Sequence, residues 1–306
     1  PGRGGRVQHR PKTSARTSRN CTLKRSLFPP AFPQMDDGVV VELTNHLVVQ
    51  VTSIAVCLLL GKKLCPNHED PWYVADLLVS LVVFPLLAVA AIGSVLDLRH
   101  TVTSRWTGVT PGTRFFLLLY IARCLVHMPV QAMEKMSPKL LIMMTVHHAV
   151  SITCFGSGLL TGRMHFWGCL DGCCEVSTVF LNFMYCGKQF SIQDRRLEDL
   201  FPKVFAVNGL GLWLSFVIFR IMLFPAWLYY WYQDVVTHPE LTWTPCSPME
   251  RYIYPSVTVM LLVLSAMWFV PLTKGVRKVV LVLRGLGPPE QEAADDEGFV
   301  KLNDKE

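Results

Sequence analysis

Runs of about twenty apolar residues are the feature that most constrains the fold of this chain. A helix of about twenty residues is the length that crosses roughly 30 Å of hydrocarbon. The chain has 306 residues, of which 51% are hydrophobic and only 17% are charged, whereas soluble domains carry about 25% charged residues. The sequence therefore predicts an all-α, polytopic membrane helical bundle, in which one membrane domain accounts for almost the whole chain.

We expect about seven transmembrane helices. Their approximate ranges are 39–60, 72–96, 114–133, 140–160, 164–186, 203–224 and 252–272. The sixth run continues into an aromatic cluster at residues 227–232, which is typical of a membrane–water interface.

The distribution of Lys and Arg over the short loops predicts the orientation, because cytoplasmic loops carry an excess of these residues. One side of the predicted topology has many of them, namely Lys62, Lys63, Lys135, Lys139, Lys188, Arg195, Arg196, Lys203, Lys274, Arg277, Lys278 and Arg284. The opposite side has fewer, namely Arg99, Arg105, Arg114, Arg163 and Arg251. We therefore expect a cytoplasmic C-terminus.

The N-terminal segment has a composition of its own. Residues 1–34 contain eight Lys and Arg and no acidic residue, so that of the net charge of +6 the remainder contributes 6 − 8 = −2. Such a segment could suggest nucleic acid or anionic lipid as a partner. Met35 is the first methionine and directly precedes the first apolar run. We expect the native chain to start there, the segment 1–34 to be a disordered basic tail, and no nucleic acid to be bound.

Polar residues inside three of the apolar runs form the candidate site. They are His147 and His148 in the fourth run; Glu175, Ser177, Thr178 and Asn182 in the fifth; and Asn208 and Arg220 in the sixth. Ionisable groups at bilayer depth are costly, so they usually face the protein interior and indicate a function. An arginine at that depth needs a carboxylate, and we expect Arg220 to pair with Glu175.

Each of these features also has a structural explanation. The two histidines could hydrogen-bond neighbouring helices, contact lipid or take part in catalysis, and the Ser/Thr/Asn face could simply hold helices together. His165, Cys169 and Cys173 follow one another at a spacing of four residues, which could suggest a soft metal site. Small residues at close helix contacts explain the same cysteines, so we expect no metal and no cofactor.

The order of these motifs resembles a known family. The histidine pair is followed by Glu175, which lies 175 − 147 = 28 positions after His147, then by an Asn-Gly pair that begins at Asn208, and then by Arg220. This order is similar to that of the TLC domain, named for a translocation-associated membrane protein, the ceramide synthases and a ceroid-lipofuscinosis protein. Residues 175–182 resemble the acidic-x-Ser-Ser/Thr-Pro-Phe-x-Asn string of TLC domain-containing proteins outside the synthase branch, and residues 274–278 resemble their exit to the cytosol.

The resemblance divides the chain. It implies a TLC-like transmembrane domain at 72–278. The apolar runs and the charge distribution then give a first transmembrane helix and loop at 35–71 and a cytoplasmic tail at 279–306. The resemblance further implies helices around a lipid-accessible cavity, in the endoplasmic reticulum or another endomembrane rather than the plasma membrane. Membrane lipids are the expected partners, and the sequence does not identify any protein partner.

Three functions remain open on this basis. The first is an influence on membrane lipid composition or homeostasis through lipid bound in an intramembrane polar cavity. The second is a ceramide-synthase-like N-acyltransferase with acyl-CoA as substrate, in which His147 or His148 is the nucleophile or base and Glu175 is the orienting carboxylate. Synthases carry a second Asp where this chain has Thr178, which weakens that interpretation. The third is a membrane cargo escort or transporter.

Overall fold

The computed structural model describes residues 37–64, 68–192 and 195–284, and these are almost entirely helical, which confirms the fold class. The helices are α1 (Asp37–Leu64), α2 (Pro71–Leu98), α3 (Val102–Thr107), α4 (Pro111–Met133), α5 (Pro138–Thr161), α6 (His165–Gly172), α7 (Glu175–Gln189), α8 (Leu197–Leu200), α9 (Pro202–Phe216), the π-helix η1 (Val217–Met222), α10 (Leu223–Thr237) and α11 (Pro248–Leu283). The strands β1 (Ser191–Ile192) and β2 (Arg195–Arg196) form a short antiparallel pair. The expected tail at 1–34 and residues 285–306 of the expected C-terminal tail lie outside the described residues.

Four of the long helices begin in the same way, with a capping side chain followed by proline. Asp70, Thr110, Ser137 and Ser247 each bind a backbone N–H in the first turn of α2, α4, α5 and α11. The proline that follows has no N–H to leave unsatisfied, and its φ angle suits the start of a helix. Short sequence signals therefore fix where these membrane helices start.

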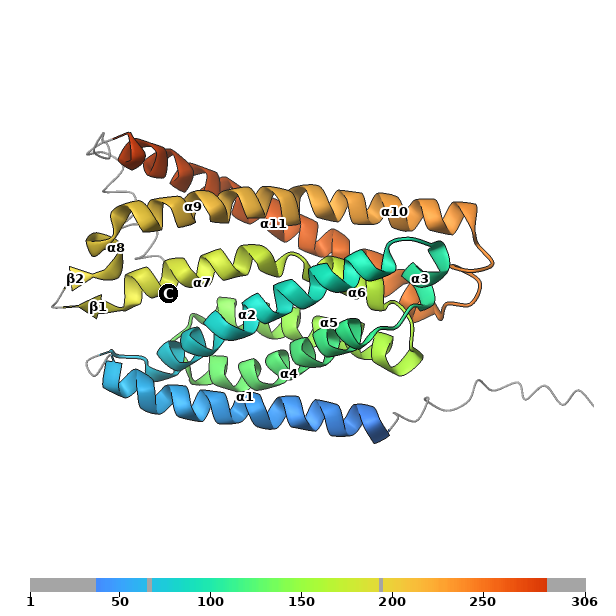
Figure 1. Cartoon of the computed structure of the whole chain (residues 1–306), viewed down its shortest axis with the longest axis horizontal. Coiled ribbons are helices and arrows are strands. Elements are labelled where there is room, and N and C mark those ends of the chain that lie inside the picture. Colours follow the sequence, from blue (N-terminus) through green and yellow to red (C-terminus); the bar gives the residue numbers. More distant parts are fainter. Residues whose placement is uncertain (1–36, 65–67, 193–194, 285–306) are drawn as a thin grey trace, which may run out of the picture. The chain divides into compact units, whose positions relative to one another are not determined.

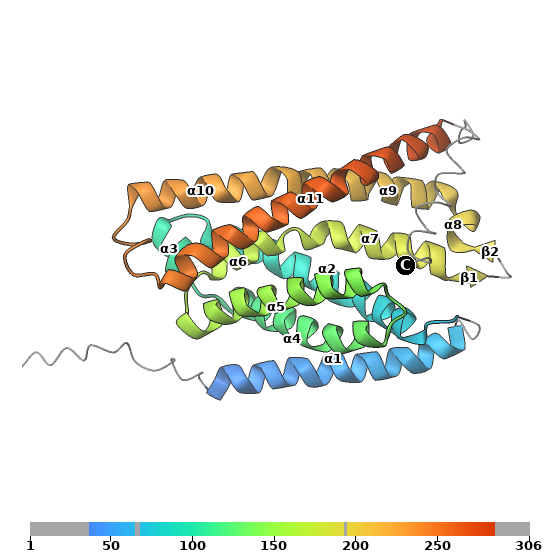
Figure 2. The same cartoon turned by 180° about the vertical axis from the view of Figure 1, so that it is seen from behind.

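The helices lie side by side with alternating direction (Figures 1 and 2). At one end, the loops before α2 and α5 are joined by the Lys135 backbone N–H, which donates to Asp70 Oδ2 over 2.7 Å. At the other end, the Met164 N–H donates to the Trp106 carbonyl over 3.2 Å, connecting the start of α6 to α3. The loops that are rich in Lys lie at the first of these two ends, beside the loops before α2 and α5.

Six helices are long and apolar enough to cross a membrane, within the described part of the chain. The prediction of one continuous fifth helix at 164–186 was wrong, because the chain breaks there into α6 and α7. At the break, the N–H groups of Cys174, Val176 and Ser177 bond to carbonyls three residues back instead of four. A Cβ atom on Gly172 would lie 2.0 Å from the Phe116 ring, so α6 approaches α4 too closely for any other residue.

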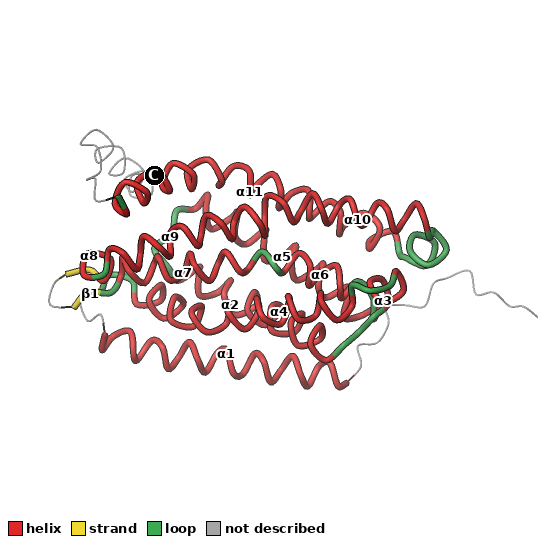
Figure 3. Tube along the Cα trace, turned by 45° about the horizontal axis from the view of Figure 1, so that its top comes forward, coloured by secondary structure: helices red, strands yellow, loops and turns green. Residues whose placement is uncertain are grey.

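The outer faces of the helices are apolar, as expected of a chain surrounded by lipid. Helix α1 packs on α2 and α4 and lies at the edge of the bundle (Figure 3). Its remaining face exposes large aliphatic side chains, among them Val48, Val49 and Leu59. Hydrophobic surface on this scale would be unstable in water, so these helices belong to an integral, multi-pass membrane protein.

A tryptophan cluster forms the core at the α3 end of the bundle. Trp106, Trp167, Trp227 and Trp231 are buried, with the rings of Trp106 and Trp231 4.4 Å apart. The indole N–H of Trp106 donates to Asp234 over 2.9 Å, so this buried ring has a hydrogen-bond partner. The prediction of an interfacial belt at 227–232 was therefore wrong for the two tryptophans, although the tyrosines of that segment are exposed.

The contact between α6 and α4 predicts a large effect of one methyl group. Gly172→Ala should destabilise the protein by about 1–3 kcal/mol, because the added Cβ would overlap the Phe116 ring. Gly156→Ala is the matched control, because nothing lies within 4 Å of a Cβ there and alanine favours the helix. Thermal unfolding of the purified protein in one detergent measures both. Equal melting temperatures for the two variants would contradict the close contact.

Candidate functional site

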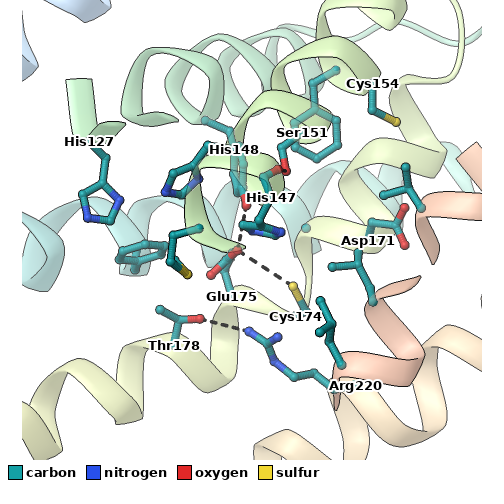
Figure 4. A pocket seen from close by; sticks show the side chains of 18 of the residues that line it. His127, His147, His148, Ser151, Cys154, Asp171, Cys174, Glu175, Thr178 and Arg220 are labelled. Carbon is teal, nitrogen blue, oxygen red and sulfur yellow. Dashed lines mark hydrogen bonds between the residues drawn. The ribbon is translucent and has the colours of Figure 1, made fainter. Parts of the chain in front are cut away.

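A cavity of about 210 Å³ lies inside the bundle, between α4, α5, α6, α7, η1 and α11 (Figure 4). Five of the residues singled out in the sequence line it, namely His147, His148, Glu175, Thr178 and Arg220. They come from three separate segments, α5, α7 and η1. The structure therefore brings most of the candidate residues to one place.

The two histidines differ in their surroundings. Their ring centroids are 5.4 Å apart, and a third histidine, His127 of α4, lies 5.0 Å from His148 on its other side. His148 is buried, and neither of its ring nitrogens has a hydrogen-bond partner in the protein. A buried imidazole without partners is costly. The ring of His148 can therefore form a hydrogen bond with a molecule that enters the cavity.

Glu175 provides the negative charge of the site. It is the first residue of α7, where the N-terminal end of the helix dipole stabilises a carboxylate. The Tyr120 hydroxyl donates to Glu175 Oε1 over 3.2 Å, and the thiol of Cys174 lies 3.8 Å from the same oxygen. In Figure 4 the carboxyl group of Glu175 lies beside the His147 ring. The His147 imidazole and the Glu175 carboxylate thus face the same cavity.

The expected ion pair between Arg220 and Glu175 is not formed among the ion pairs of the described residues, so this prediction was wrong. Arg220 instead donates to two hydroxyls on α7, from Nε to Ser177 Oγ over 2.8 Å and from Nη2 to Thr178 Oγ1 over 3.2 Å. Arg220 lies in the π-helix η1, directly before α10, which contains Pro225. The guanidinium is therefore held against α7 by neutral partners.

The other three candidate residues do not line the cavity. Ser177 accepts the bond from Arg220, and Asn182 is buried on α7 with its amide nitrogen unpaired. Asn208 donates to the Phe180 carbonyl over 2.9 Å, which joins α9 to α7. Their position on the correct helices was predictable, whereas their facing direction was not.

Comparison with protein families shows to which family the chain belongs. The sequence matches the TLC domain over residues 73–274. The chain belongs to the TLC domain family. Comparison with curated proteins and with solved structures gives no significant match. The broken helix, the histidine pair and the cavity thus lie within the matched TLC domain, and α1 precedes the matched region.

Asp171 is a cavity residue of this TLC domain that the sequence analysis missed. It lies at the end of α6, four residues before Glu175, and its side chain is buried. The Thr258 hydroxyl of α11 lies 3.2 Å from both of its carboxyl oxygens. A second carboxyl group thus lies on the other side of the helix break from Glu175. Its position inside an apolar run was the available signal.

A second polar cluster lies behind the cavity, between α2 and α4 of the TLC domain. Arg123 Nη2 lies 2.7 Å from Asp76 Oδ2, and His127 Nε2 lies 3.2 Å from the same oxygen. Ser80 accepts a further bond from Arg123 over 2.9 Å. The ion pair explains why an arginine is tolerated in the middle of the third predicted span.

One group of described residues has the spacing of a metal site. Ligand atoms of Asp76, His127 and Glu134 lie within 4.8 Å of one another. The Arg123 guanidinium already supplies a positive charge to Asp76, so we assign this group to the ion pair. His165, the other metal candidate, has both ring nitrogens engaged, by Thr113 Oγ1 at 3.1 Å and by the Gly158 carbonyl at 3.2 Å.

The Asp76–Arg123 pair predicts non-additive effects of mutation. Asp76→Leu or Arg123→Leu alone should destabilise the TLC domain by about 3–5 kcal/mol, because one buried charge is left uncompensated. The double variant should recover much of this loss. The exposed pair of Arg114 with Glu42 is the control, and Arg114→Gln should cost less than about 1 kcal/mol. Additive losses in thermal unfolding of the double variant would contradict a paired role.

Proposed function

We propose that this TLC-family membrane protein influences membrane lipid composition by binding a lipid in its intramembrane cavity. The observation that carries the proposal is the mixed lining of the cavity. Polar and charged side chains, among them His147, Glu175 and Arg220, line it. Apolar side chains such as Met143 of α5 and Leu264 of α11 line it as well. A ligand with a polar group and an aliphatic chain matches such a lining.

The size of the cavity further limits the range of lipids that can bind. Pockets for drug-sized ligands hold about 300–1,000 Å³, and this cavity holds about 210 Å³. A single aliphatic chain with a small polar end fits this volume better than a whole diacyl lipid. Trp268 of α11, which also lines the cavity, is partly exposed on the lipid-facing surface. We infer that the chain enters sideways from the bilayer, beside α11.

We also propose an orientation and a compartment. The Lys-rich loops gather at the end of the bundle that includes the C-terminal end of α11, which favours a cytoplasmic C-terminus. Membership of the TLC domain family favours the endoplasmic reticulum or another endomembrane. Protease protection of terminal tags in intact microsomes, combined with organelle markers, tests both statements.

Lipid binding predicts a defined effect of the cavity charges. Glu175→Gln and Arg220→Gln should each weaken binding about ten- to a hundredfold, because a hydrogen bond to a charged group contributes about 1.5–3 kcal/mol. His100→Ala, at an exposed turn after α2, is the control. Native mass spectrometry of the purified protein measures bound lipid, and lipid profiling of cells measures the consequence. Unchanged bound lipid and unchanged lipid classes in both cavity variants would contradict the proposal.

An N-acyltransferase is the second candidate function, favoured by one observation. His147 and Glu175 face one cavity, and Asp171 adds a carboxyl group to it. Under this proposal a histidine acts as nucleophile or general base, and acyl-CoA and a long-chain base are the substrates. Asp171 would then stand in for the acid that synthases carry at the position of Thr178.

Acyl transfer predicts a chemical signal that lipid binding alone does not give. The purified protein should release free CoA from acyl-CoA in the presence of a long-chain base. His147→Ala or His148→Ala should reduce this release about 10²–10⁴-fold, the usual contribution of general acid–base catalysis. His100→Ala should leave it unchanged. Wild-type protein that binds lipid and releases no CoA would exclude the enzyme and retain the first proposal.

A further inference from the structure

Several buried polar atoms without a protein partner lie between the cavity and the Lys-rich end of the bundle. Within the described part of the chain, they include Asp76 Oδ1, Arg123 Nε and Nη1, Glu134 Oε1, and both ring nitrogens of His148. More than nine-tenths of buried polar groups have a partner, and ordered water usually serves those that the protein does not satisfy. The clustering of so many in one region therefore needs an explanation.

These groups form a continuous column. Atoms of Glu134, Asp76 and His127 lie within 4.8 Å of one another. The ring centroids of His127 and His148 are 5.0 Å apart, and those of His148 and His147 are 5.4 Å apart. One water molecule bridges two polar atoms about 5.5 Å apart, since each of its hydrogen bonds measures about 2.8 Å. The spacing of the rings is therefore comparable with the span of one bridging water molecule.

The column has one end at the aqueous surface and the other in the cavity. Glu134 follows the last residue of α4 and is only half-buried. Burial and the charges of Asp76 and Asp70 raise the pKa of Glu134 to about 7, so this carboxyl group takes up and releases protons near neutral pH. At the other end, His127 and His148 line the cavity itself. The opposite wall, formed by residues such as Leu261 and Leu264 of α11, is apolar.

We propose that Glu134, Asp76, His127 and His148 form a path that admits water and protons from the aqueous phase at the Lys-rich end to the cavity. Chains of Asp, Glu and His in membrane interiors carry protons. An imidazole accepts a proton on one ring nitrogen and releases one from the other, so it returns to its starting charge. The path thereby supplies the cavity with water and with exchangeable protons, whichever lipid is bound there.

The charges beside the path balance. Arg123 of α4 neutralises Asp76 of α2, so the middle of the column has no net charge to repel a proton. On the cavity side, Glu175 of α7 and Arg220 of η1 have opposite signs. Water that reaches His148 thus meets polar groups along its way and the apolar side chains of α11 beyond them.

Deuterium exchange at the C2 carbon of histidine tests the path, because it requires water at each ring and is resolved residue by residue in mass spectrometry. The full chain in lipid nanodiscs is incubated in D₂O over a range of pH. We expect His127 and His148 to exchange at least tenfold faster than His165. His165 is the internal control, because it is buried with both ring nitrogens engaged by the protein. Exchange of His148 as slow as that of His165 would overturn the proposal.

A variant at the aqueous end tests the direction of entry. Glu134→Leu closes the path with an apolar side chain and should slow exchange at His127 and His148 at least tenfold, with exposed His100 unchanged. Glu134→Gln keeps the shape and polarity of the side chain, and exchange should stay within about threefold of wild type. Unchanged exchange at His148 in the Leu variant would show that water enters elsewhere and would overturn the assignment. The wild-type comparison decides the proposal if the Leu variant does not fold.

Discussion

The ion pair between Asp76 and Arg123 is the interaction on which the centre of this bundle depends. Hydrocarbon offers no water to either charge, so α2 and α4 must lie side by side for each to be neutralised. The same carboxylate holds His127 at 3.2 Å, and His127 in turn contacts His148 of α5. One buried pair thereby positions three helices and one wall of the cavity.

The fold and much of the cavity could be predicted because lipid imposes a simple rule on sequence. Apolar runs of membrane length located the helices, and the few polar residues inside those runs were functional candidates. His147, Glu175 and Arg220 were found in this way, and all three line the cavity. That Arg220 does not pair directly with Glu175 was not predictable, because opposite charges indicate a need for neutralisation but do not show whether the two side chains reach each other. Two hydroxyls of α7 take the guanidinium instead.

Departures from helical regularity were beyond the reach of the sequence patterns. The predicted fifth helix was continuous, yet α6 ends at Gly172, which packs tightly against the Phe116 ring. Asp171 stood inside an apolar run, but its position in the cavity lining beside this break was not encoded by a local pattern. The direction of Asn208 likewise depends on the Phe180 carbonyl of a neighbouring helix, which no local pattern encodes.

The two irregular segments lie opposite each other, and this placement connects the fold with the proposed chemistry. Irregular backbone is tolerated at membrane depth only where protein buries it or where it borders a cavity. The break between α6 and α7 leaves Glu175 at a helix N-terminus, where a carboxylate is stabilised. Arg220 of the π-helix reaches across to the next turn of α7. A continuous helix through residues 172–175 would remove the helix N-terminus that stabilises Glu175. These irregular segments thus stabilise charged side chains in a cavity at membrane depth. They are the feature to compare first between members of the TLC domain family.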